Sequence, residues 1–173
     1  FPPSPTGPLH IGNVRTALYN YIFAKKNGGD FIVRIEDTDK ARSKKEYEDS
    51  ILESLEWLGL KRDGELLHQS ERTEIYKKYL QKLIDENKAY LSTETEGENR
   101  EVVRFRNPNK SVKFDDLVRG VVEFDTTELK DFVIAKSVDE PLYHLAVVID
   151  DFESGITHVI RGEEHISNTP RQI

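Results

Sequence analysis

Hydrophobic positions recur at helical spacing in three stretches of the chain. The first covers residues 11–27, where Val14, Leu18 and Ile22 recur every four residues. Apolar residues at this spacing form one face of an amphipathic helix, and a glycine after the last turn is typical of a helix end. Gly28 stands at that place. The pattern therefore predicts a helix that begins close to the N-terminus of the chain.

The second helix is predicted from residue 43 to residue 58. Ser43 and Glu46 stand three positions apart, which is the signature of a capping box at a helix start. Ile51, Leu55 and Leu58 then follow at helical spacing, and we expect all three on the inner face of the helix.

The third helix is predicted over residues 71–86. Its apolar residues again repeat at three- and four-residue intervals. We expect four side chains to face inward: Ile75, Tyr79, Leu80 and Leu83.

Short apolar runs between these helices read as strands. Residues 31–36 read as a buried strand that ends in an acidic turn, and residues 156–161 read as a second one, followed by a helix start at 162–165. Between them, residues 92–100 read as a loop, and β-like runs follow at 102–106, 117–124 and 132–136.

Helix and strand segments in this order predict an α/β fold. We expect an incomplete doubly wound, Rossmann-like parallel sheet, whose first strand lies mostly before Phe1, with a small β-rich insertion. The predicted division is 1–84 for the first half of a nucleotide-binding domain, 85–138 for the insertion, and 139–173 for the start of the second half.

Composition narrows the class of protein. The chain has 173 residues, of which 36% are hydrophobic and 33% charged, with a formal net charge of −7. This charge argues against binding nucleic acid through the overall field. Residues 100–119 carry six basic and three acidic side chains, so a local phosphate-binding face and an ordinary solvated strand pair both remain open.

Absent residue types and segments add further limits. Cysteine is absent, which excludes disulfides and thiolate zinc sites. No apolar run reaches the length of a membrane span and no signal peptide is visible, so we expect a cytoplasmic protein with no membrane partner. Methionine is also absent, Phe1 lies inside a motif, and Ile173 lies inside an apparent helix. We expect either a piece of a longer protein or an engineered piece.

The first thirteen residues hold the strongest candidate for chemistry. A turn rich in proline and glycine leads into the first helix, and His10 stands at the helix start between Gly7 and Gly12. Glycines let a ligand approach the backbone, and a helix N-terminus offers free N–H groups and a partial positive charge. This arrangement suits a phosphate, and the alternative is a turn histidine that caps its neighbours.

Two more candidates stand at predicted strand ends. Glu36 ends the strand 31–36, and the carboxyl ends of parallel strands are where such folds bind ligands. The alternative for Glu36 and Asp39 is surface pairing with Arg34 or Lys40. Arg161 ends the strand 156–161, and its forked guanidinium suits recognition of a carboxylate, with a buried salt bridge as the alternative.

The run Pro-Ser-Pro-Thr-Gly-Pro-Leu-His-Ile-Gly-Asn at residues 3–13 resembles the His-Ile-Gly-His signature of class I aminoacyl-tRNA synthetases. It resembles glutamyl-tRNA synthetases most, as do Arg-Ile-Glu-Asp-Thr-Asp at 34–39 and Val-Ile-Arg-Gly-Glu-Glu-His at 159–165. The resemblance implies activation of glutamate by ATP and transfer of the glutamyl group to tRNA, with His10 and Gly12 as the catalytic residues.

The resemblance also assigns ligands to residues. ATP, with Mg²⁺, would be held by Thr6, Gly7, His10, Gly12, Asn13 and Glu164. Glutamate would be held by Ser4, Glu36, Tyr143, Val147 and Arg161, with Tyr143 as plain core the alternative. The tRNA acceptor stem would contact Arg104 and Arg106, no zinc site is expected, and we expect a monomer.

Three departures from the family pattern qualify this assignment. The family has an arginine directly before the position of Phe1, the insertion here is short and lacks the zinc-binding cysteines of many relatives, and the chain ends before a Lys-Met-Ser-Lys-Ser-type loop. The alternatives are a relative that glutamylates a modified tRNA base, a glutaminyl enzyme, and a non-catalytic piece that only binds ATP or an acceptor stem.

Overall fold

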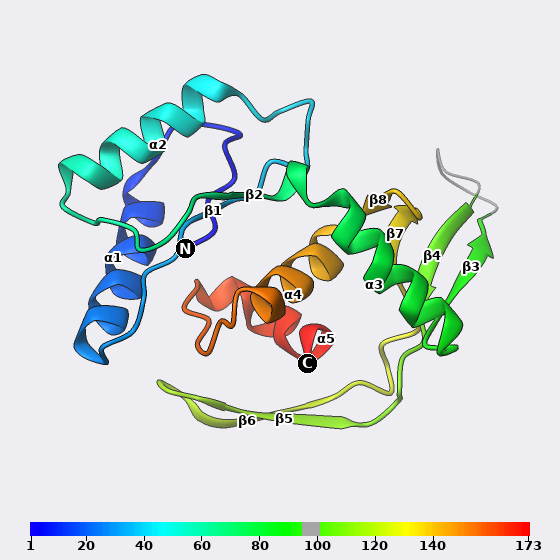
Figure 1. The fold of residues 1–173 in the computed structure, drawn as a ribbon. Coiled ribbons are helices and arrows are strands. Elements are labelled where there is room, and N and C mark those ends of the chain that lie inside the picture. The colour runs from blue at the N-terminus through cyan, green and yellow to red at the C-terminus, as the bar shows by residue number, and fades with distance from the viewer. Residues whose placement is uncertain (95–100) are drawn as a thin grey trace. The chain divides into compact units, whose positions relative to one another are not determined.

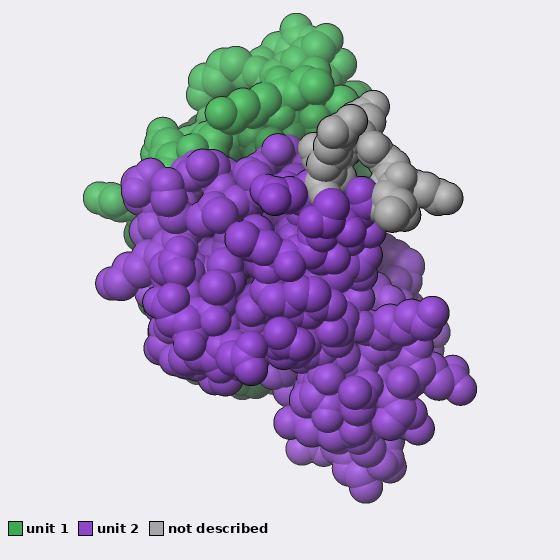
Figure 2. Space-filling model, turned by 90° about the vertical axis from the view of Figure 1, so that its right-hand side faces the viewer, with its two compact units in different colours: residues 1–72, 158–162 green, residues 73–157, 163–173 purple. Residues whose placement is uncertain are grey.

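The computed structural model describes residues 1–94 and 101–173, which form two compact units. Unit 1 comprises residues 1–72 and 158–162, and unit 2 comprises residues 73–157 and 163–173 (Figure 2). The fold is mixed α/β, as the sequence predicts. The predicted three-part division at residues 84 and 138 stays a prediction.

Unit 1 contains two helices and a small parallel sheet (Figure 1). Its elements are α1 (Ile11–Lys26), β1 (Arg34–Ile35), α2 (Lys45–Trp57), β2 (Leu67–His68) and the 3₁₀ helix η1 (Gln69–Glu71). Strands β1 and β2 are parallel, with Arg34 opposite Leu67 and Ile35 opposite His68. Parallel pairing with an intervening helix is the arrangement predicted for a Rossmann-like unit.

The N-terminal segment lies along the other edge of β1 as a third extended strand. The Arg34 N–H donates to Phe1 O at 3.1 Å, the Glu36 N–H donates to Pro3 O at 3.0 Å, and the Phe1 amino group donates to Ile32 O at 2.7 Å. Pro2 and Pro3 have no N–H to return, so the ladder is incomplete. This explains why regular strand geometry covers only 34–35 of the predicted strand 31–36.

The core of unit 1 lies between the two helices and this sheet. Its buried members come from α1, from β1 and the residues just before it, and from α2 and the turn after it: Ala17, Phe31, Val33, Ile35, Ile51, Leu55 and Leu60. The expectation for Leu58 is wrong, since it is 38% exposed, just before Gly59, which has a φ of +73°. A positive φ favours glycine and turns the chain out of the helix.

The predicted capping box at the start of α2 is also wrong. The helix begins at Lys45, and the cap position is Lys44, whose side chain makes no capping hydrogen bond. The Ser43 N–H instead donates to Asp39 O at 2.9 Å, and the Lys44 N–H donates to Pro5 O at 3.0 Å. The turn after residue 39 therefore uses the residue that the sequence pattern assigned to the helix cap.

Unit 2 combines several helices with an antiparallel sheet and a separate hairpin (Figure 1). Its helices are α3 (Thr73–Asp85), α4 (Tyr143–Glu153), the 3₁₀ helix η2 (Glu163–Asn168) and the short α5 (Thr169–Gln172). The sheet has the order β3-β4-β7-β8, formed by Ala89–Thr93, Glu101–Phe105, Phe132–Ser137 and Glu140–Pro141. The hairpin joins β5 (Ser111–Asp116) to β6 (Gly120–Asp125).

Helices α3 and α4 pack on the sheet of unit 2. Buried residues of the two helices and of β3, β4 and β7 form one cluster: Tyr76, Leu80, Ala89, Val103, Ile134, Ala135, Leu145, Ala146 and Ile149. The predicted inward residues Ile75, Tyr79 and Leu83 are partly buried against it. Leu80 is buried as predicted, but Tyr76, which is equally buried, was not predicted to face inward, and its hydroxyl donates to the buried carboxylate of Asp150 at 2.8 Å.

Three strand and loop predictions need correction. Residues 156–161 are not a strand, and His158 and Val159 are exposed rather than buried. The predicted loop at 92–100 begins late, because Ser92 and Thr93 belong to β3 and residues 95–100 lie outside the described residues. The run 117–124 includes the hairpin turn, while the preceding strand β5 was not predicted.

Candidate functional site

The loop before α1 places His10 at the cap position of the helix. His10 is extended, with φ −118° and ψ 167°, and its Nδ1 accepts the Gly12 N–H at 3.1 Å. An Nδ1 that accepts carries no proton, so in the neutral ring the proton is on Nε2. The first turn of α1 contains no acidic side chain. The helix start therefore offers N–H groups and an imidazole donor to an anion.

Gly7 and Gly12 differ in the space that the structure leaves for a side chain. A Cβ on Gly12 would lie 2.9 Å from His10 Cε1 and 3.0 Å from Nδ1, so a side chain there would displace the imidazole. A Cβ on Gly7 would meet no atom within 4 Å. Packing within the chain thus requires Gly12, whereas the space beside Gly7 is open. Thr6, which donates its N–H to Ser4 O at 2.9 Å, and Asn13 are half-buried, and Ser4 is exposed.

Glu36 lies directly after β1 and is only 8% exposed. Its Oε1 is 3.2 Å from Arg34 Nη2, and Arg34 is equally buried at 5%. The alternative of pairing with Arg34 is therefore realised, but inside the fold rather than on the surface. Asp39 pairs instead with Arg42, with 2.6 Å between Asp39 Oδ2 and Arg42 Nε. Hydrogen bonds from Arg42 lower the pKa of the Asp39 carboxyl.

Arg161 belongs to the same unit as His10 and Glu36, although it lies far from them in sequence. The adjacent Ile160 O accepts a hydrogen bond from Asn20 Nδ2 at 2.9 Å, and the His158 ring lies 4.9 Å from the Phe23 ring. Helix α1 thus carries His10 at its start and holds the Arg161 segment against its side. The Arg161 side chain is half-buried.

The remaining predicted ligands of ATP and glutamate lie in unit 2. Tyr143 is the first residue of α4 and is 39% exposed, with its ring 5.3 Å from the His144 ring. Val147 lies one turn later and is 6% exposed, while Glu164 is exposed on η2. Their roles stay predictions.

The two arginines predicted to bind tRNA already have partners within unit 2. Arg104 donates from Nε to Glu94 Oε1 and from Nη1 to Asp131 O, both at 2.8 Å. The Arg106 guanidinium lies 4.4 Å from the centre of the Tyr90 ring and is more exposed. A guanidinium that lies over an aromatic ring keeps its N–H donors, which lie in its own plane, for another ligand. A phosphate contact therefore fits Arg106 better than Arg104.

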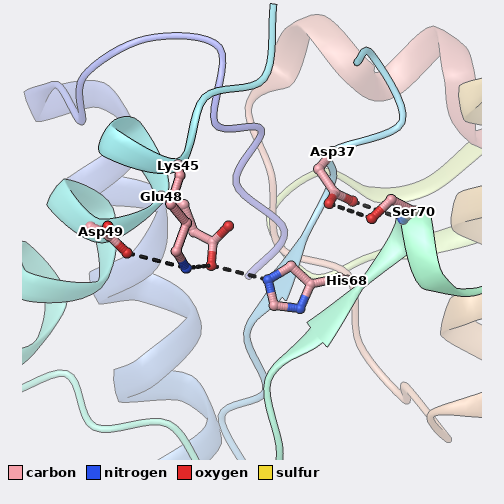
Figure 3. A network of polar contacts seen from close by, with 6 residues as sticks. All are labelled: Asp37, Lys45, Glu48, Asp49, His68 and Ser70. Atoms are coloured by element: carbon pink, nitrogen blue, oxygen red, sulfur yellow. Dashed lines mark hydrogen bonds and ion pairs between the residues drawn. The ribbon is translucent and has the colours of Figure 1, made fainter.

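Sequence reasoning missed a set of polar contacts beside Glu36 (Figure 3). Asp37 accepts two hydrogen bonds from Ser70, which follows β2. Glu48 of α2 accepts from Lys45 at 2.8 Å and contacts His68 Nε2 of β2 at 3.0 Å. Burial raises the pKa of the Glu48 carboxyl, but the hydrogen bonds from Lys45 and His68 outweigh burial and leave that pKa lowered. The acidic turn after Glu36 was the available signal for Asp37.

Within residues 1–94 and 101–173, no three His, Asp or Glu side chains are grouped so that they could hold a metal ion. In the same part of the chain, no helix has the length and apolar character needed to cross a bilayer.

Comparison with protein families gives one match that covers the chain. The model of the catalytic domain of class I tRNA synthetases (E and Q) matches residues 1–101 and residues 92–173. The glutamate–tRNA ligase 1 of Petrotoga mobilis is 51% identical over 199 residues, and the glutamate–tRNA ligase of Carboxydothermus hydrogenoformans is 47% identical over 218 residues. Both alignments include the whole chain but only 43% and 45% of the relatives.

Solved structures give the same result. A glutamate tRNA ligase from Elizabethkingia meningosepticum, in complex with its amino acid, superposes with a TM-score of 0.89 at 36% identity. A second structure, from Elizabethkingia anophelis, also gives 0.89. The superposition covers 99% of this chain and 44% or 45% of those chains. The chain thus spans less than half the length of the proteins that it matches.

Proposed function

Since the chain belongs to the family of class I tRNA synthetases for glutamate and glutamine, whose catalytic domain it matches over its whole length, we propose that it serves glutamate–tRNA ligation. The α-carboxylate of glutamate attacks the α-phosphorus of ATP, which forms glutamyl-adenylate and releases pyrophosphate. The glutamyl group then passes to a hydroxyl of the terminal ribose of tRNA, and AMP leaves. We infer a cytoplasmic, monomeric setting for this reaction.

The start of α1 is the proposed ATP phosphate site. Its N–H groups and the Nε2–H of His10 stabilise negative charge on the phosphates as pyrophosphate departs, which is the main demand of this reaction. Gly12 supports the proposal because it leaves room for the His10 ring, and Gly7 because its open side admits a ligand. Thr6 and Asn13 complete this set, and Glu164 would accept hydrogen bonds from the ribose.

Glu36 and Arg161 are the proposed determinants for glutamate. The Glu36 carboxylate holds the amino group, while the Arg161 guanidinium holds the side-chain carboxylate through two parallel hydrogen bonds. The burial of Glu36 supports this assignment, because a carboxylate shielded from water binds an ammonium group more strongly than an exposed one. The family resemblance also assigns Ser4, Tyr143 and Val147 to glutamate binding.

Magnesium would enter with ATP. Mg²⁺ is usually held by one or two carboxylates together with substrate phosphates and water, rather than by a cage of side chains. Across the described ranges, no cluster of three acidic or histidine side chains forms such a cage. We therefore take the phosphates themselves as the principal ligands of the ion.

The observation that carries the proposal is the family match over the full chain. ATP–pyrophosphate exchange, measured with each amino acid in turn, tests it. Exchange with glutamate alone supports the proposal, whereas exchange with glutamine would assign the chain to the glutaminyl branch. The start of α1, with its N–H groups and imidazole, on its own supports a second candidate, binding of ATP without turnover. That candidate predicts ATP binding in calorimetry and no exchange with any amino acid.

A further inference from the structure

The carboxyl end of β1 is tied to the segment after β2 by one side chain. Asp37 Oδ1 accepts the Ser70 N–H at 2.8 Å, and Asp37 Oδ2 accepts the Ser70 hydroxyl at 2.6 Å (Figure 3). Both oxygens of a half-buried carboxylate are thus directed at one residue. Hydrogen bonds to a charged acceptor are stronger than those between neutral groups, so this contact fixes the two segments firmly.

Regular pairing between β1 and β2 ends before Glu36. The paired residues are Arg34 with Leu67 and Ile35 with His68. Glu36 follows directly, and on the opposite edge its N–H donates to Pro3 O. On the β2 side, the hydrogen bonds between Asp37 and Ser70 take over where the strand pairing stops. Glu36 is therefore held from both edges of β1.

We propose that Asp37 and Ser70 are positioning residues for the Glu36 carboxylate, an inference that rests on the proposed function of Glu36 as holder of the glutamate amino group. A binding side chain has to be kept within roughly 0.5 Å of its productive position. A misplacement of about 1 Å at a site of this kind can cost roughly 100-fold. Asp37 makes no contact with the ligand in this proposal and acts only through the backbone of Glu36.

The same segment offers a matched control at its other end. Asp63 Oδ2 accepts the Phe31 N–H at 2.8 Å and contacts Lys25 Nζ at 2.6 Å. Asp63 therefore ties the amino end of residues 31–36 just as Asp37 ties the carboxyl end. A purely structural role predicts similar consequences for loss of either carboxylate, whereas positioning predicts an effect on glutamate from Asp37 alone.

The test compares Asp37→Ala, Asp37→Asn and Asp63→Ala in the full 173-residue chain. Calorimetric titration with glutamate and with ATP gives the affinities, and urea denaturation gives stability. We expect Asp37→Ala to weaken glutamate binding at least about tenfold and to leave ATP binding unchanged. In Asp37→Asn, the amide oxygen can accept the Ser70 N–H, and the amide NH₂ group can donate a hydrogen bond to the Ser70 hydroxyl oxygen. This variant should therefore recover most of the glutamate affinity. Asp63→Ala should lower stability without changing either affinity.

Hydrogen exchange at two backbone amides separates this inference from the proposed function. Asp37→Ala should accelerate exchange at the Glu36 amide, and Asp63→Ala should accelerate exchange at the Phe31 amide only. If the unaltered chain binds no glutamate, the proposed function of Glu36 fails, and exchange at Glu36 still decides whether Asp37 positions it. Unchanged exchange at Glu36 in Asp37→Ala, or equal losses of glutamate affinity in Asp37→Ala and Asp63→Ala, would overturn the inference.

Discussion

Replacement of Gly12 by alanine should separate ATP binding from stability. The new Cβ would lie 2.9 Å from His10 Cε1, well inside the 3.5–4.0 Å at which carbon atoms pack favourably. The imidazole is the movable partner, so it turns away and its Nδ1 no longer accepts the N–H of residue 12. Gly12→Ala therefore removes His10 from the helix start without changing His10 itself.

The effects on stability nearly cancel. Loss of the His10 cap costs about 0.5–2 kcal/mol, while alanine in place of glycine in a helix gains up to about 1 kcal/mol. The free energy of unfolding should therefore change by no more than about 1 kcal/mol. Loss of a hydrogen bond to a charged phosphate costs about 1.5–3 kcal/mol, which corresponds to roughly 10- to 150-fold weaker ATP binding.

Calorimetry with ATP and urea denaturation measure the two quantities. Gly29→Ala, just beyond the other end of α1, is the control, because its Cβ would lie 3.7 Å from Ala24 O, an ordinary contact. His10→Ala completes a double-mutant cycle, in which Gly12→Ala should add no further loss. Unchanged ATP affinity in Gly12→Ala, or an equal loss in the His10→Ala background, would refute the reasoning.

Three further predictions concern charged side chains. Arg161→Gln should weaken glutamate binding by about two orders of magnitude or more and leave ATP affinity nearly intact, because the substitution removes the cation and leaves the side-chain carboxylate of glutamate without its partner. Calorimetry with both ligands checks this. Arg106→Ala should weaken tRNA binding, and flatten the dependence of that binding on salt, more than Arg104→Ala does. The reason is that Glu94 already neutralises Arg104. Titrations at several salt concentrations measure the slope of affinity against salt for each variant. Because the pKa of Glu48 is lowered, its ionised form stabilises the fold above the ordinary pKa of 4.5. This contribution is lost as pH falls through the lowered pKa. The free energy of unfolding of Glu48→Gln should therefore fall less steeply with decreasing pH, which acid unfolding measures.

Three of the four longer helices in the described part of the chain were predictable because their signals are local, whereas α4 was not predicted. Apolar periodicity places α1 and α3 within two residues of their observed ends, since an amphipathic helix repeats its pattern every turn. The start of α2 was not predictable in the same way. Ser43 carries the capping signature, but a preceding turn takes its N–H, and no local pattern ranks the two uses.

The strands were less predictable because a strand depends on its neighbours. Residues 31–36 are buried and extended as expected, yet the ladder is incomplete because the adjacent segment carries Pro2 and Pro3. Residues 156–161 have the composition of a strand but no strand among the described residues to pair with. One of their contacts is made by Ile160 O, which accepts a hydrogen bond from the side chain of Asn20, 140 residues away in sequence.

Parts of the candidate site also have local signals in the sequence, whereas other parts depend on contacts between distant segments. Residues at a helix start or strand end, such as His10 and Glu36, were identifiable because those positions are recognisable from local pattern. Two contacts join distant segments next to the candidate residues, Asp37 with Ser70 beside Glu36 and Asn20 with Ile160 O beside Arg161, and neither leaves a periodic trace in the sequence. Because Asp63 and Asp37 tie opposite ends of one short segment, that segment is fixed at both ends although it has only two residues of regular strand. A binding carboxylate on so short a strand therefore depends on side-chain ties more than on the sheet.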